Sequence, residues 1–241
     1  MSGHSKWSQI RHKKEATDAK RGQLFSKLIR EITVAAREGG PNPASNTRLR
    51  AAIERARGAG LPKDHVGRAV ERASGKGEAG ELTEFLYEAA APGGIAILIE
   101  GITDSKNRSL AEIKHILTLH GARLAEAGSL SWNFEKVGVL EFRKDATPKT
   151  PEEAELAIIE SGASDFRALD DAWLVETPFT ERERIREALE ARGVPAGEAG
   201  HDYKPRAAIE PDPKERKKAE PLLDALAEHP DVQEVYTNLA L

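Results

Sequence analysis

The sequence predicts an α+β protein of several domains, with an N-terminal three-helix domain and two α+β domains, the last inserted into the middle one. Three observations predict this organisation. Apolar residues recur at helical spacing between residues 18 and 75, and the spacing changes to that of strands after residue 81. Residues 137–209 then show the order β-α-β-β-α-β of a ferredoxin-like domain.

Three amphipathic helices are expected first, over residues 18–38, over 46–57, and from Pro62 to just before Gly75. The first should end at Gly39-Gly40-Pro41, because glycine favours the left-handed cap and proline cannot continue the helix. Its apolar side chains fill one arc, and the opposite arc is basic. The basic arc consists of Lys20, Lys27, Arg30 and Arg37.

Residues 75–81 are expected to form a linker. They match G-x-G-x-x-G, but they follow a helix and precede a strand, which is the wrong context for a dinucleotide site. The elements expected beyond the linker are strands 84–88 and 95–99, helix 105–120, strand 129–134, strand 137–142, helix 151–161, strands 165–169 and 172–176, helix 181–192, strand 203–209, helix 213–228 and strand 232–238. Ser105 is placed to cap the helix that follows it.

The order of these elements indicates three domains. Residues 1–78 are expected to form a basic helical domain. Residues 79–135 form an α+β domain that lacks a helix and a strand, and residues 210–241 supply both. Residues 136–209 are the inserted ferredoxin-like domain.

Composition excludes several classes of function. None of the 241 residues is cysteine, which rules out disulfides and thiolate chemistry, and the longest apolar run is Ile95–Ile99, far short of a membrane span. We therefore expect a cytoplasmic protein without membrane contact. The seven histidines are scattered, so we expect no metal. No pattern assembles a nucleophile, a base and an oxyanion donor, so neither an enzyme nor a cofactor is expected.

Charge is distributed unevenly along the chain. Residues 1–76 contain 17 Lys and Arg against 7 Asp and Glu, whereas the whole chain contains 36 against 40. A basic end on an acidic chain is typical of a module that approaches the phosphates of nucleic acid. The residues expected to contact phosphates are Lys6, Arg11, Lys13, Lys14, Lys20, Arg21, Lys27, Arg30, Arg37, Arg48 and Arg50.

Several segments resemble one known family. They are Gly3–Trp7, Ala19–Gly22, Phe25–Arg37, Asn46–Arg50, Pro92–Gly94 and Thr103–Arg108, and together they are similar to the YebC/PmpR family, which also contains a mitochondrial translational activator. The resemblance covers essentially the whole chain. It implies three domains and a non-enzymatic regulator of gene expression, DNA-binding in bacterial members and ribosome-associated in others. Residues 87–92, Y-E-A-A-A-P, depart from the family's usual Y-E-G-Y-G-P.

Three functions remain open from the sequence. The first is a DNA-binding transcriptional regulator that holds phosphates with its N-terminal arm and first helix, while the acidic α+β domains face protein partners or a second copy. The second is a translation factor that binds ribosomal RNA on the ribosome with the same basic face, because both polymers present phosphates. The third is a metabolite-binding protein, favoured only by the strand-to-helix junction at Thr103–Arg108.

Overall fold

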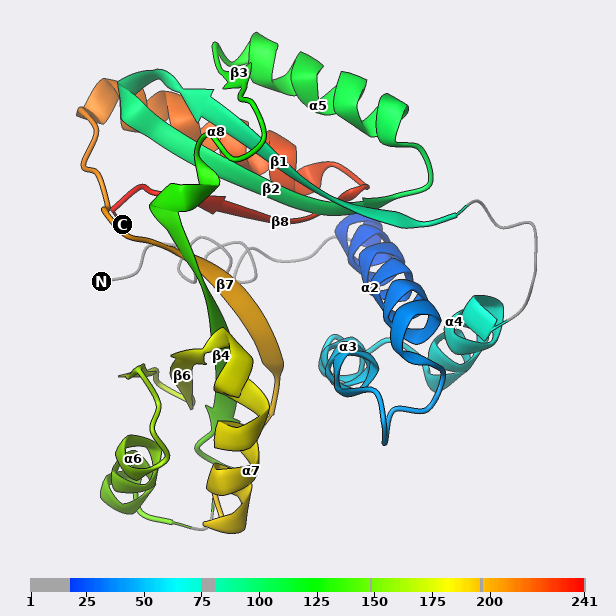
Figure 1. Cartoon of the computed structure of the whole chain (residues 1–241), viewed down its shortest axis with the longest axis vertical. Helices are drawn as coiled ribbons and strands as arrows, with labels where there is room; N and C mark the ends of the chain where they lie inside the picture. The colour runs from blue at the N-terminus through cyan, green and yellow to red at the C-terminus, as the bar shows by residue number, and fades with distance from the viewer. Residues whose placement is uncertain (1–17, 75–80, 148, 196, 241) are drawn as a thin grey trace. The chain divides into compact units, whose positions relative to one another are not determined.

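The computed structural model describes residues 18–74, 81–147, 149–195 and 197–240, and it contains two compact units (Figure 1). Residues 1–135 and 204–241 form the first unit, and residues 136–203 form the second. The second unit is therefore inserted into the sequence of the first, and the protein is α+β, as predicted. The helical domain expected over residues 1–78 belongs to the first unit, so its separation as an independent domain stays a prediction.

The helical part of the first unit contains α2 (Asp18–Gly39), α3 (Thr47–Gly58) and α4 (Lys63–Ser74). These bounds confirm the three predicted helices to within one or two residues. Apolar side chains from all three helices are buried against one another, as the helical spacing of the sequence requires. This core includes Leu28, Ile32, Leu49, Ile53 and Ala69.

Asn46 joins the end of α2 to the start of α3. Its Oδ1 accepts the N–H of Leu49 at 3.0 Å, which caps α3, and its Nδ2 donates to the carbonyls of Ala35 and Gly40, each at 2.8 Å. Gly40 has a φ of 85°, a left-handed conformation that glycine adopts without a steric penalty. One buried side chain therefore fixes the turn between two helices.

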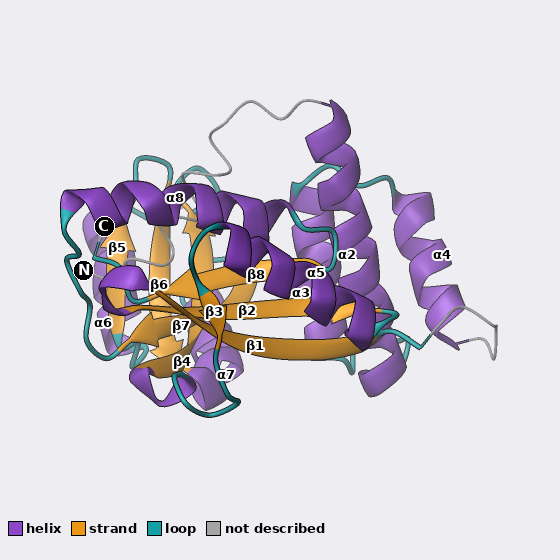
Figure 2. Ribbon diagram, turned by 90° about the horizontal axis from the view of Figure 1, so that it is seen from above, coloured by secondary structure: helices purple, strands orange, loops and turns teal. Residues whose placement is uncertain are grey.

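The first unit also contains a four-stranded sheet in the order β3-β1-β2-β8. Its strands are β1 (Thr83–Ala91), β2 (Ile95–Thr103), β3 (Arg123–Leu124) and β8 (Val232–Thr237). Helices α5 (Lys106–Leu119) and α8 (Pro213–Glu228) cover one face of this sheet (Figure 2). Ile97 and Leu98 point to opposite faces, and both are completely buried, so the central strand β2 is covered on both sides.

The strand predicted over residues 129–134 is wrong. A short 3-10 turn, η2 (Ser131–Asn133), occupies this segment, and β4 begins only at Phe134. The buried carboxylate of Glu88 draws the backbone of this segment away from a sheet ladder. It accepts three N–H groups, from Gly128 at 2.6 Å, Leu130 at 2.5 Å and Ser131 at 3.0 Å. Burial by itself would raise the pKa of Glu88, but these donors hold that pKa below its usual value.

Two further strands differ from the prediction. The strand expected over residues 203–209 is instead β7 (Ala199–Pro205), and Ile209 forms an isolated parallel bridge with Leu239. The two-residue strand β3 was not predicted, because two residues are too few to show any periodicity.

The inserted unit has the predicted ferredoxin-like order. Its elements are β4 (Phe134–Arg143), α6 (Pro151–Glu160), β5 (Asp165–Ala168), β6 (Ala172–Pro178), the 3-10 turn η3 (Phe179–Glu181), α7 (Arg182–Ala191) and β7. The sheet order is β5-β6-β4-β7, in which the first strand of the unit lies between the third and the fourth. No described helix of the protein is both long enough and apolar enough to cross a bilayer.

Candidate nucleic-acid interface

The eleven basic residues predicted to contact phosphates do not share one environment. Lys6, Arg11, Lys13 and Lys14 lie outside the described residues. The other seven lie on α2 and α3, where they fall into exposed, buried and carboxylate-paired groups. These groups differ in whether the cation can reach a phosphate.

Lys20, Arg21 and Arg37 are exposed on α2. The ammonium of Lys20 lies 3.1 Å from a carboxylate oxygen of Glu228, and both side chains are more than half exposed, so this pair contributes little stability. The Arg21 guanidinium lies 5.6 Å from the ring centroid of Phe25. Arg37 forms no ion pair with a described carboxylate. All three cations are accessible to an approaching polyanion.

Lys27 and Arg30 do not belong to an open basic face, which corrects the arc drawn from the sequence. Lys27 is buried, and its Nζ donates to the carbonyl of Ala227 at 2.7 Å. Arg30 donates from Nη1 to the Pro230 carbonyl at 2.7 Å and to Oδ1 of Asp231 at 2.6 Å. Both cations therefore hold α2 in place, Lys27 against the end of α8 and Arg30 against the segment that joins α8 to β8.

Arg48 and Arg50 are half-buried on α3. Arg48 pairs with both Glu38 and Glu84, and so it connects α3 with the end of α2 and with β1. Burial by itself would lower the pKa of Arg48, but the hydrogen bond to Glu84 and the attraction of Glu84 and Glu38 raise that pKa above its ordinary value. This arginine is committed to carboxylates of its own chain.

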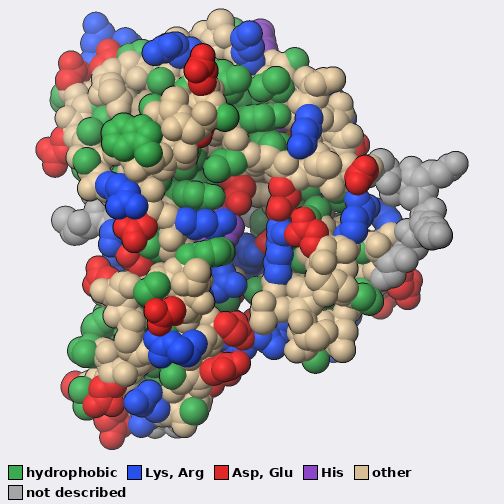
Figure 3. Space-filling view, in the orientation of Figure 1, with side chains coloured by type: hydrophobic (Ala, Val, Ile, Leu, Met, Phe, Trp, Pro, Cys, Tyr) green, Lys and Arg blue, Asp and Glu red, His purple; other side chains and the backbone are tan. Residues whose placement is uncertain are grey.

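Four exposed cations were not among the predicted contacts. They lie at the end of α3 and along α4, and they are Arg57, Lys63, Arg68 and Arg72. The excess of positive charge over residues 1–76 already indicated them, although the prediction stopped at Arg50. On the face drawn in Figure 3, basic and acidic side chains of the described residues are interspersed. The exposed cations of the helical part lie on all three helices: Lys20, Arg21 and Arg37 on α2, Arg57 on α3, and Lys63, Arg68 and Arg72 on α4.

The carboxylate of Asp231, which is 1% exposed, has partners on three elements of the first unit. In addition to Arg30, it accepts hydrogen bonds from Ser109 Oγ at 2.6 Å, Arg108 Nη2 at 2.8 Å and Thr103 Oγ1 at 3.1 Å. Burial by itself would raise the pKa of Asp231. The hydrogen bonds from Ser109, Arg108 and Thr103, together with the charge of Arg30, lower that pKa to about 2. We call these five residues the Asp231 cluster.

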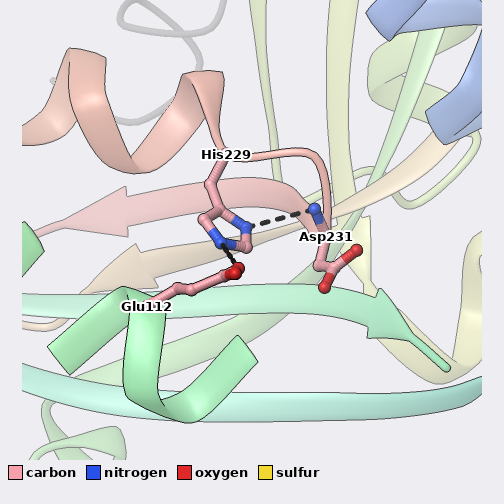
Figure 4. Close-up of side chains that lie close together, drawn as sticks. All are labelled: Glu112, His229 and Asp231. Carbon is pink, nitrogen blue, oxygen red and sulfur yellow. Dashed lines mark hydrogen bonds and ion pairs between the residues drawn. The ribbon is translucent and has the colours of Figure 1, made fainter. Parts of the chain in front are cut away.

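His229 and Glu112 lie beside this cluster (Figure 4). The Nδ1 atom of His229 accepts the backbone N–H of Asp231 at 3.2 Å, so its proton lies on Nε2, which is 2.9 Å from Glu112. Glu112, His229 and Asp231 have ligand atoms close enough to hold a metal ion. However, the Asp231 carboxylate already neutralises two guanidinium groups, and both His229 nitrogens are engaged. The donor set therefore fits a structural hydrogen-bond network better than a cation site.

The Thr103–Arg108 junction, which favoured a metabolite site in the sequence, faces the Asp231 cluster. Ser105 does not cap α5 with its side chain; instead its backbone N–H donates to Oγ1 of Thr103 at 2.9 Å. Thr103 and Arg108 both donate to Asp231, which follows them by more than 120 residues. Both side chains therefore help to connect the end of β2 and the start of α5 with the segment before β8.

Comparison with known proteins decides the family. The family model described as the TACO1/YebC protein N-terminal domain matches residues 5–76, and the model described as the TACO1/YebC second and third domain matches residues 82–239. The chain belongs to the TACO1/YebC family. The boundary between the two matches falls in residues 77–81, close to the linker expected from the sequence.

Relatives in the TACO1/YebC family match over nearly their whole length. A probable transcriptional regulatory protein of Thermomicrobium roseum is 45% identical, covering 99% of this chain and 96% of its own. One of the same description from Thermotoga maritima is 42% identical, covering 100% and 94%. The crystal structure of a conserved hypothetical protein from Aquifex aeolicus is 40% identical, with a TM-score of 0.86 over 97% of this chain and 96% of that one.

Proposed function

We propose that this TACO1/YebC protein is a non-enzymatic transcriptional regulator that binds DNA through its basic N-terminal region. The observation that carries the proposal is the concentration of charge, 17 basic against 7 acidic residues within positions 1–76. Each cation that neutralises a phosphate releases a condensed counterion, which makes such a segment bind polyanions. Relatives in the family are named probable transcriptional regulatory proteins, which supports DNA as the polyanion.

The burial of individual cations refines which of them would contact DNA. We assign phosphate contact to the arm residues Lys6, Arg11, Lys13 and Lys14 and to the exposed residues Lys20, Arg21, Arg37, Arg57, Lys63, Arg68 and Arg72. Lys27, Arg30 and Arg48 instead position the helices, because each is already paired within the chain. Arg50 is half-buried and contributes at the edge of this surface.

The acidic part of the chain would be repelled by DNA except at a few local basic positions, and most of its surface is free to serve protein contacts. Residues 77–241 contain 19 basic against 33 acidic residues. We assign partner binding or self-association to this part. Phosphate contacts alone do not specify a base sequence, so a partner or the shape of the DNA would supply target selection.

Ribosomal RNA is the second polyanion that the same cations fit. Sedimentation of a cell lysate at moderate salt distinguishes the two targets, because it shows whether the full-length protein migrates with DNA or with ribosomes. We expect it to shift duplex DNA fragments in a gel and to sediment with nucleoprotein until DNase is added. Sedimentation with ribosomes that resists DNase and is abolished by RNase, without any shift of duplex DNA, would overturn the transcriptional proposal.

A further inference from the structure

Aromatic and cationic side chains gather at one place in the inserted unit. The Nζ of Lys136, at the start of β4, lies 4.6 Å from the ring centroid of Phe179 and 5.3 Å from that of Tyr203. The guanidinium of Arg182 lies 5.9 Å from the Phe179 centroid. His201 meets Phe179 and Tyr203 edge-on, with centroids 6.2 and 5.9 Å apart. We call these five residues the Lys136 cluster.

Lys136 has no carboxylate partner among the described residues, unlike half of the other cations of its unit. Residues 136–203 contain 9 basic and 16 acidic residues, so carboxylates are abundant. Four arginines of the unit pair with them: Arg143 with Asp145, Arg184 with Glu181, Arg186 with Glu183 and Glu190, and Arg192 with Glu160. Lys136 is exposed and forms no ion pair with any described carboxylate. Its ammonium is therefore accessible to an anion from solution.

The rings beside Lys136 favour an anion that is attached to a flat group. Phe179 is 41% exposed although it is a large apolar side chain, and it begins the turn η3 directly after Pro178, whose ring restricts the backbone there. Aromatic rings next to cations are what single-stranded nucleic acid binds best, because bases stack on the rings while phosphates pair with the cations.

We propose that the Lys136 cluster binds one nucleotide of a single-stranded nucleic acid, with the base against Phe179 and the phosphate at Lys136. This inference rests on the proposed function, the binding of nucleic acid by this protein. It adds a second contact, which is separate in sequence from the basic N-terminal region. The inserted unit would then bind single-stranded nucleic acid in preference to a duplex, whereas the N-terminal cations bind the phosphates of either form.

The test uses the full-length protein, a fluorescently labelled poly(dT) oligonucleotide and a duplex of equal length, with anisotropy measured over a range of salt. Lys136→Met keeps the aliphatic stem over the rings and removes the charge. We expect it to weaken oligonucleotide binding several-fold and to reduce the salt slope by about 0.7, the value for one phosphate contact on a single strand. Phe179→Leu keeps apolar volume and removes the ring. It should weaken binding about tenfold with an unchanged slope.

Arg143→Met is the matched control, because Arg143 is exposed on the same unit but already paired with Asp145. It should bind both probes as the wild type does, and thermal melting verifies that all three variants are folded. If either Lys136→Met or Phe179→Leu binds poly(dT) as tightly as the wild type does, this inference is overturned and the proposed function is not. Failure of the wild-type protein to bind either probe would overturn the proposed function together with it.

Discussion

Arg30 on α2 and Asp231 before β8 form an ion pair of 2.6 Å between residues that are 201 positions apart in the sequence. The pair joins the helical part of the first unit to its sheet. Lys27, one helical turn before Arg30, donates to the carbonyl of Ala227 in the last turn of α8. Lys27 and Arg30 therefore hold α2 in place, although their spacing in the sequence places them on the same basic face as Lys20 and Arg37. The exposed cations of α2 depend on this anchoring for their position.

Removing the Asp231 carboxylate should destabilise the first unit. We expect Asp231→Ala to lower the free energy of unfolding by about 3 kcal/mol, because it leaves Arg30 and Arg108 without their shared anion. This is the lower end of the range for a buried pair, since both arginines still reach water. Urea titration measures the change. The control Asp145→Ala breaks an exposed pair with Arg143 and should change the stability little. Equal losses for the two variants would contradict the structural role of Asp231.

Stability should fall in acid because of the same carboxylate. The pKa of Asp231 is about 2 in the folded protein and 3.8 in an ordinary aspartate, so the folded state binds this proton more weakly. Its contribution is complete above about pH 5 and disappears as the pH falls to about 2, a loss of about 2 kcal/mol. Other carboxylates titrate in the same window, so the measurement is the difference in unfolding free energy between wild type and Asp231→Asn. A difference that stays constant from pH 6 to pH 2.5 would exclude this linkage.

Gly101 should tolerate no side chain. A Cβ added there would overlap the ring of Phe85 and the backbone carbonyl of Asp231, at the point where the pairing of β2 with β8 changes register. We expect Gly101→Ala to lower stability by about 3 kcal/mol, since backbone and core atoms would both have to move. Gly67 on α4 has nothing within 4 Å of such a Cβ. Gly67→Ala should therefore raise the melting temperature and increase the free energy of unfolding by about 0.5–1 kcal/mol. A higher melting temperature for Gly101→Ala than for Gly67→Ala would contradict the packing described around these two glycines.

Replacing Lys27 and replacing Arg37 should have different effects on stability and on DNA binding, although both residues lie on α2. Lys27→Met should mainly reduce stability, because it removes the cation that donates to Ala227 from a buried position. Arg37→Met should leave the melting temperature unchanged and weaken binding to duplex DNA, because Arg37 is exposed. Thermal melting and DNA anisotropy on both variants separate the two effects. A loss of DNA affinity for Lys27→Met without any loss of stability would restore Lys27 to the binding surface.

The sequence predicted the element order because most elements show strong periodicity or clear end signals. The helix predicted over residues 213–228 was found with those bounds, since Pro213 opens it after the Asp212 cap. The strand predicted at 129–134 failed because a distant side chain, Glu88, takes up the backbone donors of that segment. Such an interaction between residues some 40 positions apart leaves no local pattern.

The sequence shows where the positive charge of the candidate interface is concentrated. It does not show which of these cations are buried or paired within the chain. The count of basic residues located the region, but burial of Lys27 and pairing of Arg48 depend on where Ala227 and Glu84 lie in the fold. Asp231 could not be singled out from the sequence, since its partners Arg30, Thr103, Arg108 and Ser109 come from two distant segments. Periodicity places residues on faces, and only tertiary structure decides which faces meet.

The salt dependence of duplex DNA binding tests the central claim most directly. The variant carries Lys13→Glu, Lys14→Glu, Lys20→Glu and Arg37→Glu, and the matched control reverses four exposed lysines of the acidic part, Lys106, Lys114, Lys214 and Lys217. If the basic N-terminal region holds the phosphates, the slope of log affinity against log salt falls by about 0.9 for each phosphate that the variant no longer neutralises, while the control keeps the wild-type slope. An unchanged slope in the N-terminal variant, or an equal fall in the control, would contradict the account.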